Sequence, residues 1–174
     1  IAALTLICAM LLQIATNIAN DYLDFKKGVD TDKRIGPVRV TSKGLIPDYQ
    51  MRNALILLLA LSFLCGVYLM ISGGPIIVLI GILSIYFSYG YTGGPYPLSY
   101  NALGEVAAFI FFGPIAVMGT TYLQTHAFSN LSLIFGCSVG LISAAILAIN
   151  NLRDIESDKE TKKKTIAILY GENF

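Results

Sequence analysis

The chain contains one very long stretch that is almost free of charge. From Asn53 to Asn151 it has no Lys or Arg, and Glu105 is its single acidic residue. The apolar runs inside this stretch are long enough for membrane helices, which need about 20 residues each. They are continuous rather than alternating, so they do not match the strands of a membrane barrel. The stretch therefore predicts an all-α fold, a multi-pass transmembrane helix bundle.

The composition of the whole chain leads to the same class. Hydrophobic residues make up 55% of the 174 residues, charged residues 13%, and the mean hydropathy is +0.68. A soluble domain carries about 25% charged residues, so this chain is too poor in charge to fold in water. We expect the lipid bilayer to be its surroundings and no nucleic acid to be among its partners.

Five apolar segments can be counted along the chain. They are Ile1 to about Asn20, about Arg52 to Ser72, Ile76 to about Gly90, about Leu103 to Leu123, and about Leu131 to Ile149. A tight turn is predicted at Gly73–Pro75, between the second and third segments. A kink is predicted at Pro114, because proline removes a backbone donor inside a helix. We expect residues 1–174 to form a single transmembrane domain.

Two polar segments border these apolar runs: residues 17–43, the first polar segment, and residues 150–164, the second polar segment. Five alternating crossings place both on the same side of the membrane, together with the Tyr91–Asn101 loop. All twelve Lys and Arg residues then lie on that side. Positive charge in short loops is typical of the cytoplasmic side. We therefore expect a protein of a prokaryotic cell membrane with both polar segments facing the cytoplasm.

Each polar segment carries carboxylates and amides at helical spacing. In the first, Asn17, Asn20, Asp21 and Asp24 are three or four residues apart and would share one helix face. In the second, three residues step by four and a further amide is adjacent: Asn150, Asp154, Asp158 and Asn151. Carboxylates at the mouth of an apolar bundle are costly unless they are paired or bind cations. The pattern predicts that the two faces meet at one site.

The ligand types in these segments suit a magnesium ion. Neither segment contains His or Cys, and hard oxygen ligands favour Mg²⁺ over a transition metal. Protein-bound Mg²⁺ usually also binds substrate phosphate, so a phosphorylated substrate is implied. The cations that we assign to phosphate contacts or to closure of the first loop are Lys27, Arg34, Arg39, Lys43 and Arg153. For Lys162–Lys164, attraction to anionic lipid headgroups explains much of the charge.

A membrane site for Mg²⁺ and phosphate suggests a lipid phosphate as substrate. If a diphosphate leaves an allylic lipid, a carbocation remains, and an apolar bundle would keep water away from it. Five tyrosine rings are candidates for cation–π contact with that carbocation: Tyr86, Tyr89, Tyr91, Tyr96 and Tyr100. For any one of these rings, an interfacial aromatic belt is the simpler interpretation.

At these residues the sequence resembles the UbiA superfamily of intramembrane aromatic prenyltransferases. Asn20 and Asp24 match the superfamily's Asn-x-x-x-Asp motif, and Asp154 and Asp158 match its Asp-x-x-x-Asp motif. The resemblance implies that these four residues hold Mg²⁺ and the diphosphate of a polyprenyl diphosphate, with Asp21 alongside. It also implies about nine helices, of which about five are present here. We therefore expect a chain truncated at both ends and inactive by itself.

Within the superfamily, the chain looks most like the MenA branch, the 1,4-dihydroxy-2-naphthoate polyprenyltransferases. The matching stretches are NDYLDFKKGVDT, RIGPVR, YTGGPYPLSYNALGE and NNLRDIESDKE. This resemblance implies transfer of a polyprenyl chain to the naphthoate ring with loss of carbon dioxide, in menaquinone or phylloquinone synthesis. Asp21 or Asp154 would deprotonate the naphthol. One departure is Gly28, where many relatives have another acid; Asp30 is a candidate substitute.

Other functions remain open at this point. One is a prenyltransferase of the same superfamily for another aromatic acceptor, such as 4-hydroxybenzoate. A CDP-alcohol phosphotransferase would carry one compact acidic signature, which is not found here. A transporter with an acidic ion path would place acids near the middle of its spans, whereas these acids lie at one edge. A soluble isoprenoid synthase is excluded by the apolar fraction.

Overall fold

The structure is a computed structural model, and it describes residues 1–29, 36–37, 39–161 and 163–171. Within these ranges the regular structure is helical, with no strand, which confirms the predicted fold class. The elements in chain order are α1 (Ala2–Lys27), α2 (Asp48–Gly90), the short 3₁₀ helix η1 (Leu98–Tyr100), α3 (Gly104–Ile110), the π-helical turn η2 (Phe111–Ile115), α4 (Ala116–Thr125), α5 (Asn130–Arg153), α6 (Ile155–Glu160) and α7 (Ile166–Tyr170).

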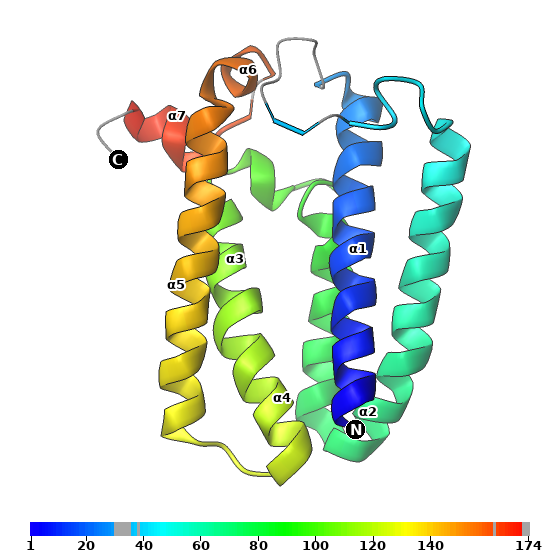
Figure 1. Ribbon diagram of the computed structural model, residues 1–174, viewed down its shortest axis with the longest axis vertical. Helices are drawn as coiled ribbons and strands as arrows, with labels where there is room; N and C mark the ends of the chain where they lie inside the picture. Colours follow the sequence, from blue (N-terminus) through cyan, green and yellow to red (C-terminus); the bar gives the residue numbers. More distant parts are fainter. Residues whose placement is uncertain (30–35, 38, 162, 172–174) are drawn as a thin grey trace.

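The four candidate membrane spans are long and apolar enough to cross a bilayer. They are α1, α2, the stretch Gly104–Thr125 and α5. The 43 residues of α2 would extend about 65 Å as a straight helix, roughly twice the hydrocarbon thickness. Gly74 interrupts it with φ 69° and ψ −160°, and the chain turns back there (Figure 1). The chain therefore makes five crossings, with the turn at the predicted Gly73–Pro75.

The first helix extends farther than its apolar run. The apolar run ends near Asn20, but the helix continues to Lys27, so Asp21 and Asp24 lie on its last turns. Gly28 then adopts the left-handed conformation with φ 67° and donates its N–H to the carbonyl of Phe25. The N–H of Val29 bonds the carbonyl of Asp24. These two bonds satisfy carbonyl groups of the last helical turn, as is common where a helix ends at a glycine.

The fourth span is kinked where Pro114 predicts it, and small residues fill the contact beside the kink. Gly113 has the non-helical pair φ −101° and ψ −107°. A Cβ on Gly113 would lie 2.6 Å from the carbonyl oxygen of Gly136 and 2.7 Å from Cα of Gly140. Glycines on both helices therefore let α5 approach α3 and η2 backbone to backbone, as small residues do in membrane bundles. Figure 1 shows α5 running alongside α3 and α4.

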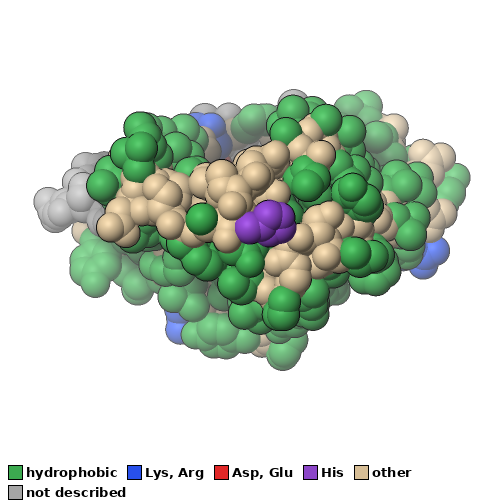
Figure 2. All heavy atoms as spheres, turned by 90° about the horizontal axis from the view of Figure 1, so that it is seen from below, with side chains coloured by type: hydrophobic (Ala, Val, Ile, Leu, Met, Phe, Trp, Pro, Cys, Tyr) green, Lys and Arg blue, Asp and Glu red, His purple; other side chains and the backbone are tan. Residues whose placement is uncertain are grey.

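Charged residues are segregated to one end of the bundle. The end of α1, the 91–103 loop and α6 all lie together at the top of Figure 1. Figure 2 shows the opposite end, where His126 lies among apolar groups and backbone and no Asp or Glu is visible. The two polar segments thus reach the same end of the bundle, as the count of crossings predicts.

The close contact between α3 and α5 can be tested with one methyl group. A Cβ at Gly140 would lie 2.5 Å from the carbonyl oxygen of Phe109, so Gly140→Ala should lower stability by about 1–3 kcal/mol. Gly66→Ala is the matched control, because its Cβ would meet only Met70 Cε at 3.8 Å. Thermal unfolding of the full-length protein in detergent measures both. Equal midpoints for the two variants would contradict this packing.

Candidate functional site

A cavity of about 590 Å³ opens at the polar end of the bundle. This volume lies in the range typical of small-molecule sites. Its wall combines polar side chains from both polar segments with apolar ones such as Ile14 and Leu147. The polar lining residues that the sequence had singled out are Asn17, Asn20, Asp21, Arg39, Tyr91, Asn150, Asn151, Arg153, Asp154 and Asp158.

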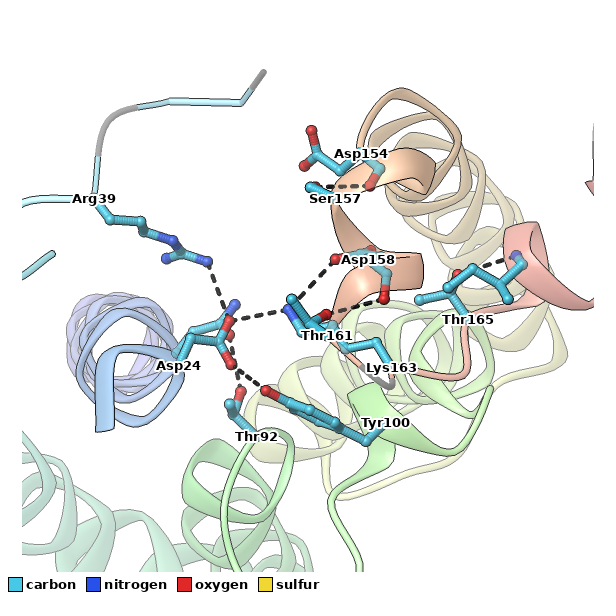
Figure 3. Close-up of polar contacts among 12 residues, drawn as sticks. Asp24, Arg39, Thr92, Tyr100, Asp154, Ser157, Asp158, Thr161, Lys163 and Thr165 are labelled. Atoms are coloured by element: carbon cyan, nitrogen blue, oxygen red, sulfur yellow. Dashed lines mark hydrogen bonds and ion pairs between the residues drawn. The ribbon is translucent and has the colours of Figure 1, made fainter. Parts of the chain in front are cut away.

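Asp24 lies next to this wall, at the centre of a network of ions and hydrogen bonds (Figure 3). Its carboxylate is completely buried. The hydroxyl of Tyr100 donates to Oδ1 at 2.8 Å, and Lys163 Nζ lies 3.1 Å from Oδ2. Arg39 Nη2 lies 3.8 Å from the same Oδ2. A buried carboxylate needs such partners, and these three come from three separate segments of the chain.

Lys163 connects the two acidic motifs. The same ammonium that pairs with Asp24 lies 3.8 Å from Asp158 Oδ1, and it stands 5.4 Å from the centre of the Tyr100 ring. Only 13% of its side chain is exposed. The headgroup interpretation is therefore wrong for Lys163, whereas Lys162 lies outside the described residues. Sequence spacing could not find it, because α6 ends at Glu160 and no helical register relates Lys163 to Asp158.

Asp21 holds the loop that follows α1. Its two carboxylate oxygens accept backbone N–H groups, Oδ2 from Val40 at 3.1 Å and Oδ1 from Thr41 at 3.3 Å. Asp21 and Thr41 are both buried. The carboxylate is thus committed to the loop backbone. Asp21 lines the cavity mainly as an anchor for the segment that carries Arg39.

Asn20 and Lys27 bind the end of α1 to the loop after α2. The hydroxyl of Thr92 donates to Asn20 Oδ1 at 3.0 Å, and Lys27 Nζ donates to the carbonyl of Thr92 at 2.5 Å. The ammonium of Lys27 also lies 4.0 Å from the centre of the Tyr100 ring. Thr92 and Tyr100 therefore belong to the site. The sequence analysis gave Thr92 no role, whereas Tyr100 was one of its candidates for cation–π contact.

Asp154 marks the junction between α5 and α6. Its φ of −92° and ψ of 8° interrupt the helix, yet Asp154 N–H bonds Asn150 O and Asp158 N–H bonds Asp154 O. Arg153 donates to both oxygens of its carboxylate at 2.9 Å. In Figure 3 the Asp154 side chain stands apart from the Asp24–Lys163–Asp158 chain. The structure therefore separates the two acids of the second motif.

A third group of polar residues lies where α2, α3 and α5 meet. Glu105 is buried, and its Oε1 accepts from Asn151 Nδ2 at 2.8 Å. Burial raises the pKa of Tyr91, and the carboxylates of Glu105, Asp24 and Asp158 raise it further. Tyr91 therefore remains a neutral hydroxyl. The sequence analysis missed Glu105 as a site residue, although its isolation in the uncharged stretch was a visible signal.

The remaining predicted residues differ in their placement. Asn17 lines the cavity and donates to the carbonyl of Gln13 at 3.1 Å, and Asn150 lines it from the end of α5. Lys43 is exposed on the turn after Arg39. Arg34 and Asp30 lie outside the described residues.

The donor set suits a magnesium ion held partly by its substrate. Among the described residues, no three His, Cys, Asp or Glu side chains come together as a ready-made metal centre. Asp24 and Asp158 do come together, however, because one ammonium contacts both carboxylates. One or two carboxylates plus phosphate oxygens are the usual ligands of protein-bound Mg²⁺. The residues fit this ion, and their assignment as its ligands stays a prediction.

An apolar multi-pass bundle with an acid- and cation-lined cavity at one end defines the chain as a membrane protein with a polar site at the bilayer surface. The comparison with family descriptions then identifies it further. The UbiA prenyltransferase family matches residues 1–174, and the chain belongs to that family. The resemblance inferred from the motifs is thereby confirmed.

Comparison with curated relatives shows which members of the family this chain is similar to. The chain is 41% identical to the 1,4-dihydroxy-2-naphthoate octaprenyltransferase of Escherichia coli strain K12 over 99% of this chain and 58% of the relative. The enzyme of the same name from Haemophilus influenzae strain Rd is 40% identical over 98% of this chain and 58% of that relative. UbiA prenyltransferase domain-containing protein 1 of Danio rerio is 37% identical over 97% of this chain and 51% of that relative. The chain thus spans little more than half the length of these relatives. No solved structure matches it.

The anchoring role of Asp21 predicts how the loop responds to its loss. Asp21→Ala removes the acceptor of two backbone N–H groups, and hydrogen bonds to charged groups contribute about 1.5–3 kcal/mol each. Trypsin should therefore cut after Lys43 about tenfold faster or more. Asp48→Ala is the control, since the ion pair of Asp48 with Lys26 is exposed. Unchanged cleavage in Asp21→Ala would show that the loop is held by other contacts.

Proposed function

We propose that this chain carries the diphosphate and acceptor site of an enzyme that transfers a polyprenyl chain from polyprenyl diphosphate to 1,4-dihydroxy-2-naphthoate. The reaction would release carbon dioxide and give demethylmenaquinol, the reduced form of demethylmenaquinone, in a step of menaquinone or phylloquinone synthesis. The observation that carries the proposal is the junction of Asp24, Lys163 and Asp158 beside the cavity. The similarity to two 1,4-dihydroxy-2-naphthoate octaprenyltransferases over nearly the whole chain supports the choice of substrates.

The cations beside the cavity suit the diphosphate. Arg39 and Lys163 both line it, and both now face the buried carboxylate of Asp24. A diphosphate oxygen entering this region would meet an Arg that binds phosphate through parallel N–H groups and a Lys that acts as a point charge. Mg²⁺ held by Asp24 and Asp158 would neutralise charge that develops on the leaving diphosphate. These residues would thereby stabilise departure of the diphosphate.

The rest of the cavity suits the carbocation and the prenyl chain. Ile14, Ile18 and Leu147 form apolar parts of its wall, where the helices enter the membrane. Such a wall keeps water from a reactive allylic cation. The Tyr100 ring already lies 4.0 Å from one ammonium and 5.4 Å from another, so its face attracts positive charge in this site.

We further propose that the protein lies in a prokaryotic cell membrane with this cavity toward the cytoplasm. The support is the collection of Lys and Arg at the same end as the cavity, which is the charge bias of cytoplasmic loops. The bacterial origin of two of the relatives points to the same kind of membrane. A transporter is less favoured, because the described carboxylates gather at this end rather than across the bundle.

The acceptor can be tested directly with the full-length protein in membranes. We expect a polyprenyl diphosphate and 1,4-dihydroxy-2-naphthoate to give prenylated product when Mg²⁺ is present, and chelation of Mg²⁺ to abolish turnover. Product is measured by extraction and mass spectrometry. The control acceptor is 4-hydroxybenzoate. Prenylation of the benzoate alone would replace the proposed acceptor, and full turnover without a divalent ion would remove Mg²⁺ from the site.

Single acids of the two motifs provide a second test. Asp24→Ala removes the carboxylate that faces Lys163 and Arg39, and Asp154→Ala removes the partner of Arg153. Each should abolish turnover while the protein still inserts in the membrane, which the membrane-fraction yield checks. Glu156→Gln is the control, because Glu156 is exposed and pairs only with Lys159 among the contacts described. Full activity of either Ala variant would refute the metal and diphosphate assignment.

A further inference from the structure

The acceptor needs a group that binds its ring hydroxyl, and the two acids named from the sequence are already engaged. Asp21 uses both oxygens on the N–H groups of Val40 and Thr41. Asp154 uses both oxygens on Arg153. In each acid, both oxygens therefore already carry a hydrogen bond that stabilises the ionised form, which makes the carboxylate a weaker base. A different carboxylate therefore has to be considered.

Glu105 differs from these acids in its hydrogen bonding. It lies in the first turn of α3, is 7% exposed and lines the cavity. Asn151 occupies Oε1, whereas Oε2 is buried and has no hydrogen-bond partner among the described residues. An unsatisfied buried acceptor is costly, and its presence calls for an explanation. A ligand hydroxyl that enters the cavity would satisfy this oxygen.

The surroundings of Glu105 suit a ring hydroxyl rather than a phosphate. The amide of Asn151 from α5 lies 2.8 Å from its Oε1. The hydroxyl oxygen of Tyr91 would lie 3.0 Å from a Cβ on Gly104, the residue before Glu105. Arg153 at the end of α5 is paired with Asp154, and Lys163 lies between Asp24 and Asp158. Among the described residues, the cavity thus has a cationic part around Arg39 and Lys163 and a second part around Glu105, where no ion pair to Glu105 is found.

We propose that Glu105 is a catalytic residue that binds a ring hydroxyl of the aromatic acceptor through Oε2 and takes its proton during prenyl transfer. This inference rests on the proposed function and replaces Asp21 and Asp154 as the base. Asn151 positions the carboxylate through Oε1. Tyr91 stands beside it as a hydroxyl that stays protonated, able to donate to a second oxygen of the acceptor.

The step balances with the groups named. The ring carbon next to the hydroxyl-bearing carbon uses its π electrons to form the new C–C bond to the prenyl carbon. The bond between that prenyl carbon and the diphosphate oxygen breaks, and its electron pair leaves with the diphosphate. The hydroxyl O–H bond breaks, its proton moves to Oε2, and its electrons form the ring carbonyl. The prenylated ring carbon then loses its carboxylate as carbon dioxide, and the electron pair of that C–C bond restores the aromatic ring. The ring oxygen takes a proton back from Oε2, so the product is the quinol and no oxidant or reductant is required.

The test is the pH profile of Glu105→Gln in the full-length protein in membranes, from about pH 6 to about pH 9. Loss of a general base should lower turnover by about 10²- to 10⁴-fold near neutral pH. The KM for polyprenyl diphosphate should stay unchanged, because the diphosphate binds elsewhere in the cavity. The remaining activity should rise with pH as the acceptor's own hydroxyl ionises. Glu156→Gln changes an exposed side chain of α6 and should match the unsubstituted protein throughout.

Two other outcomes overturn the inference. Wild-type turnover in Glu105→Gln would show that no proton passes to this residue. An equal loss at every pH, together with a raised KM for polyprenyl diphosphate, would assign Glu105 a structural role. If Glu105→Gln does not accumulate in membranes, Glu105→Asp is tested instead. This variant keeps the negative charge, but its shorter side chain places the carboxylate farther from the acceptor. It should then lower kcat at unchanged KM for the diphosphate, and an unchanged kcat overturns the proposal.

Failure of the proposed function would look different from failure of this inference. In that case the unsubstituted protein itself would transfer no prenyl chain to dihydroxynaphthoate, and the Glu105 assignment would be lost with it. If the unsubstituted protein is active and only the pH profile disagrees, the proposed function stands and Glu105 is not the base.

Discussion

The buried carboxylate of Asp24 is the interaction on which the polar end of the molecule depends. A charge at the mouth of an apolar bundle is expensive to desolvate, and its cost is offset only if partners surround it. Tyr100, Arg39 and Lys163 supply those partners from three segments that are far apart in the sequence. Satisfying one acid on α1 therefore fixes how the loops close over the helices. The same closure forms the cavity.

The low dielectric that makes burial of the Asp24 charge costly also strengthens the electrostatic interactions of this cavity with a charged ligand. Charges that are partly withdrawn from water interact more strongly, and donors held in place need no reorganisation when charge develops on a ligand. Arg39 and Lys163 are only 16% and 13% exposed in their side chains, so their charge is directed inward. The described hydrogen-bond partner of Glu105 is the neutral amide of Asn151. The cavity thus separates a place for the diphosphate from a place for the hydroxyl-bearing ring.

Helix packing deep in the bundle positions this second part of the cavity. Gly113, Gly136 and Gly140 let α3 and α5 approach until backbone atoms meet. The same two helices carry Glu105 and Asn151, whose side chains lie 2.8 Å apart. A wider spacing of the helices would separate the carboxylate from the amide that orients it. The glycine contacts in the membrane and the hydrogen bond at its surface are therefore parts of one arrangement.

The sequence alone determined the spans, the turn at Gly73–Pro75, the kink at Pro114 and the shared side of the two polar segments. These follow from hydropathy, chain parity and backbone chemistry, all of which are local properties. It also singled out most of the polar cavity lining through helical spacing. Only the tertiary structure decided which charges pair: Lys163 with two acids, Asp21 with the loop backbone, Asp154 with Arg153, and Glu105 with Asn151. Pairing across the chain depends on how loops and helices pack, and no periodicity within a single segment encodes it.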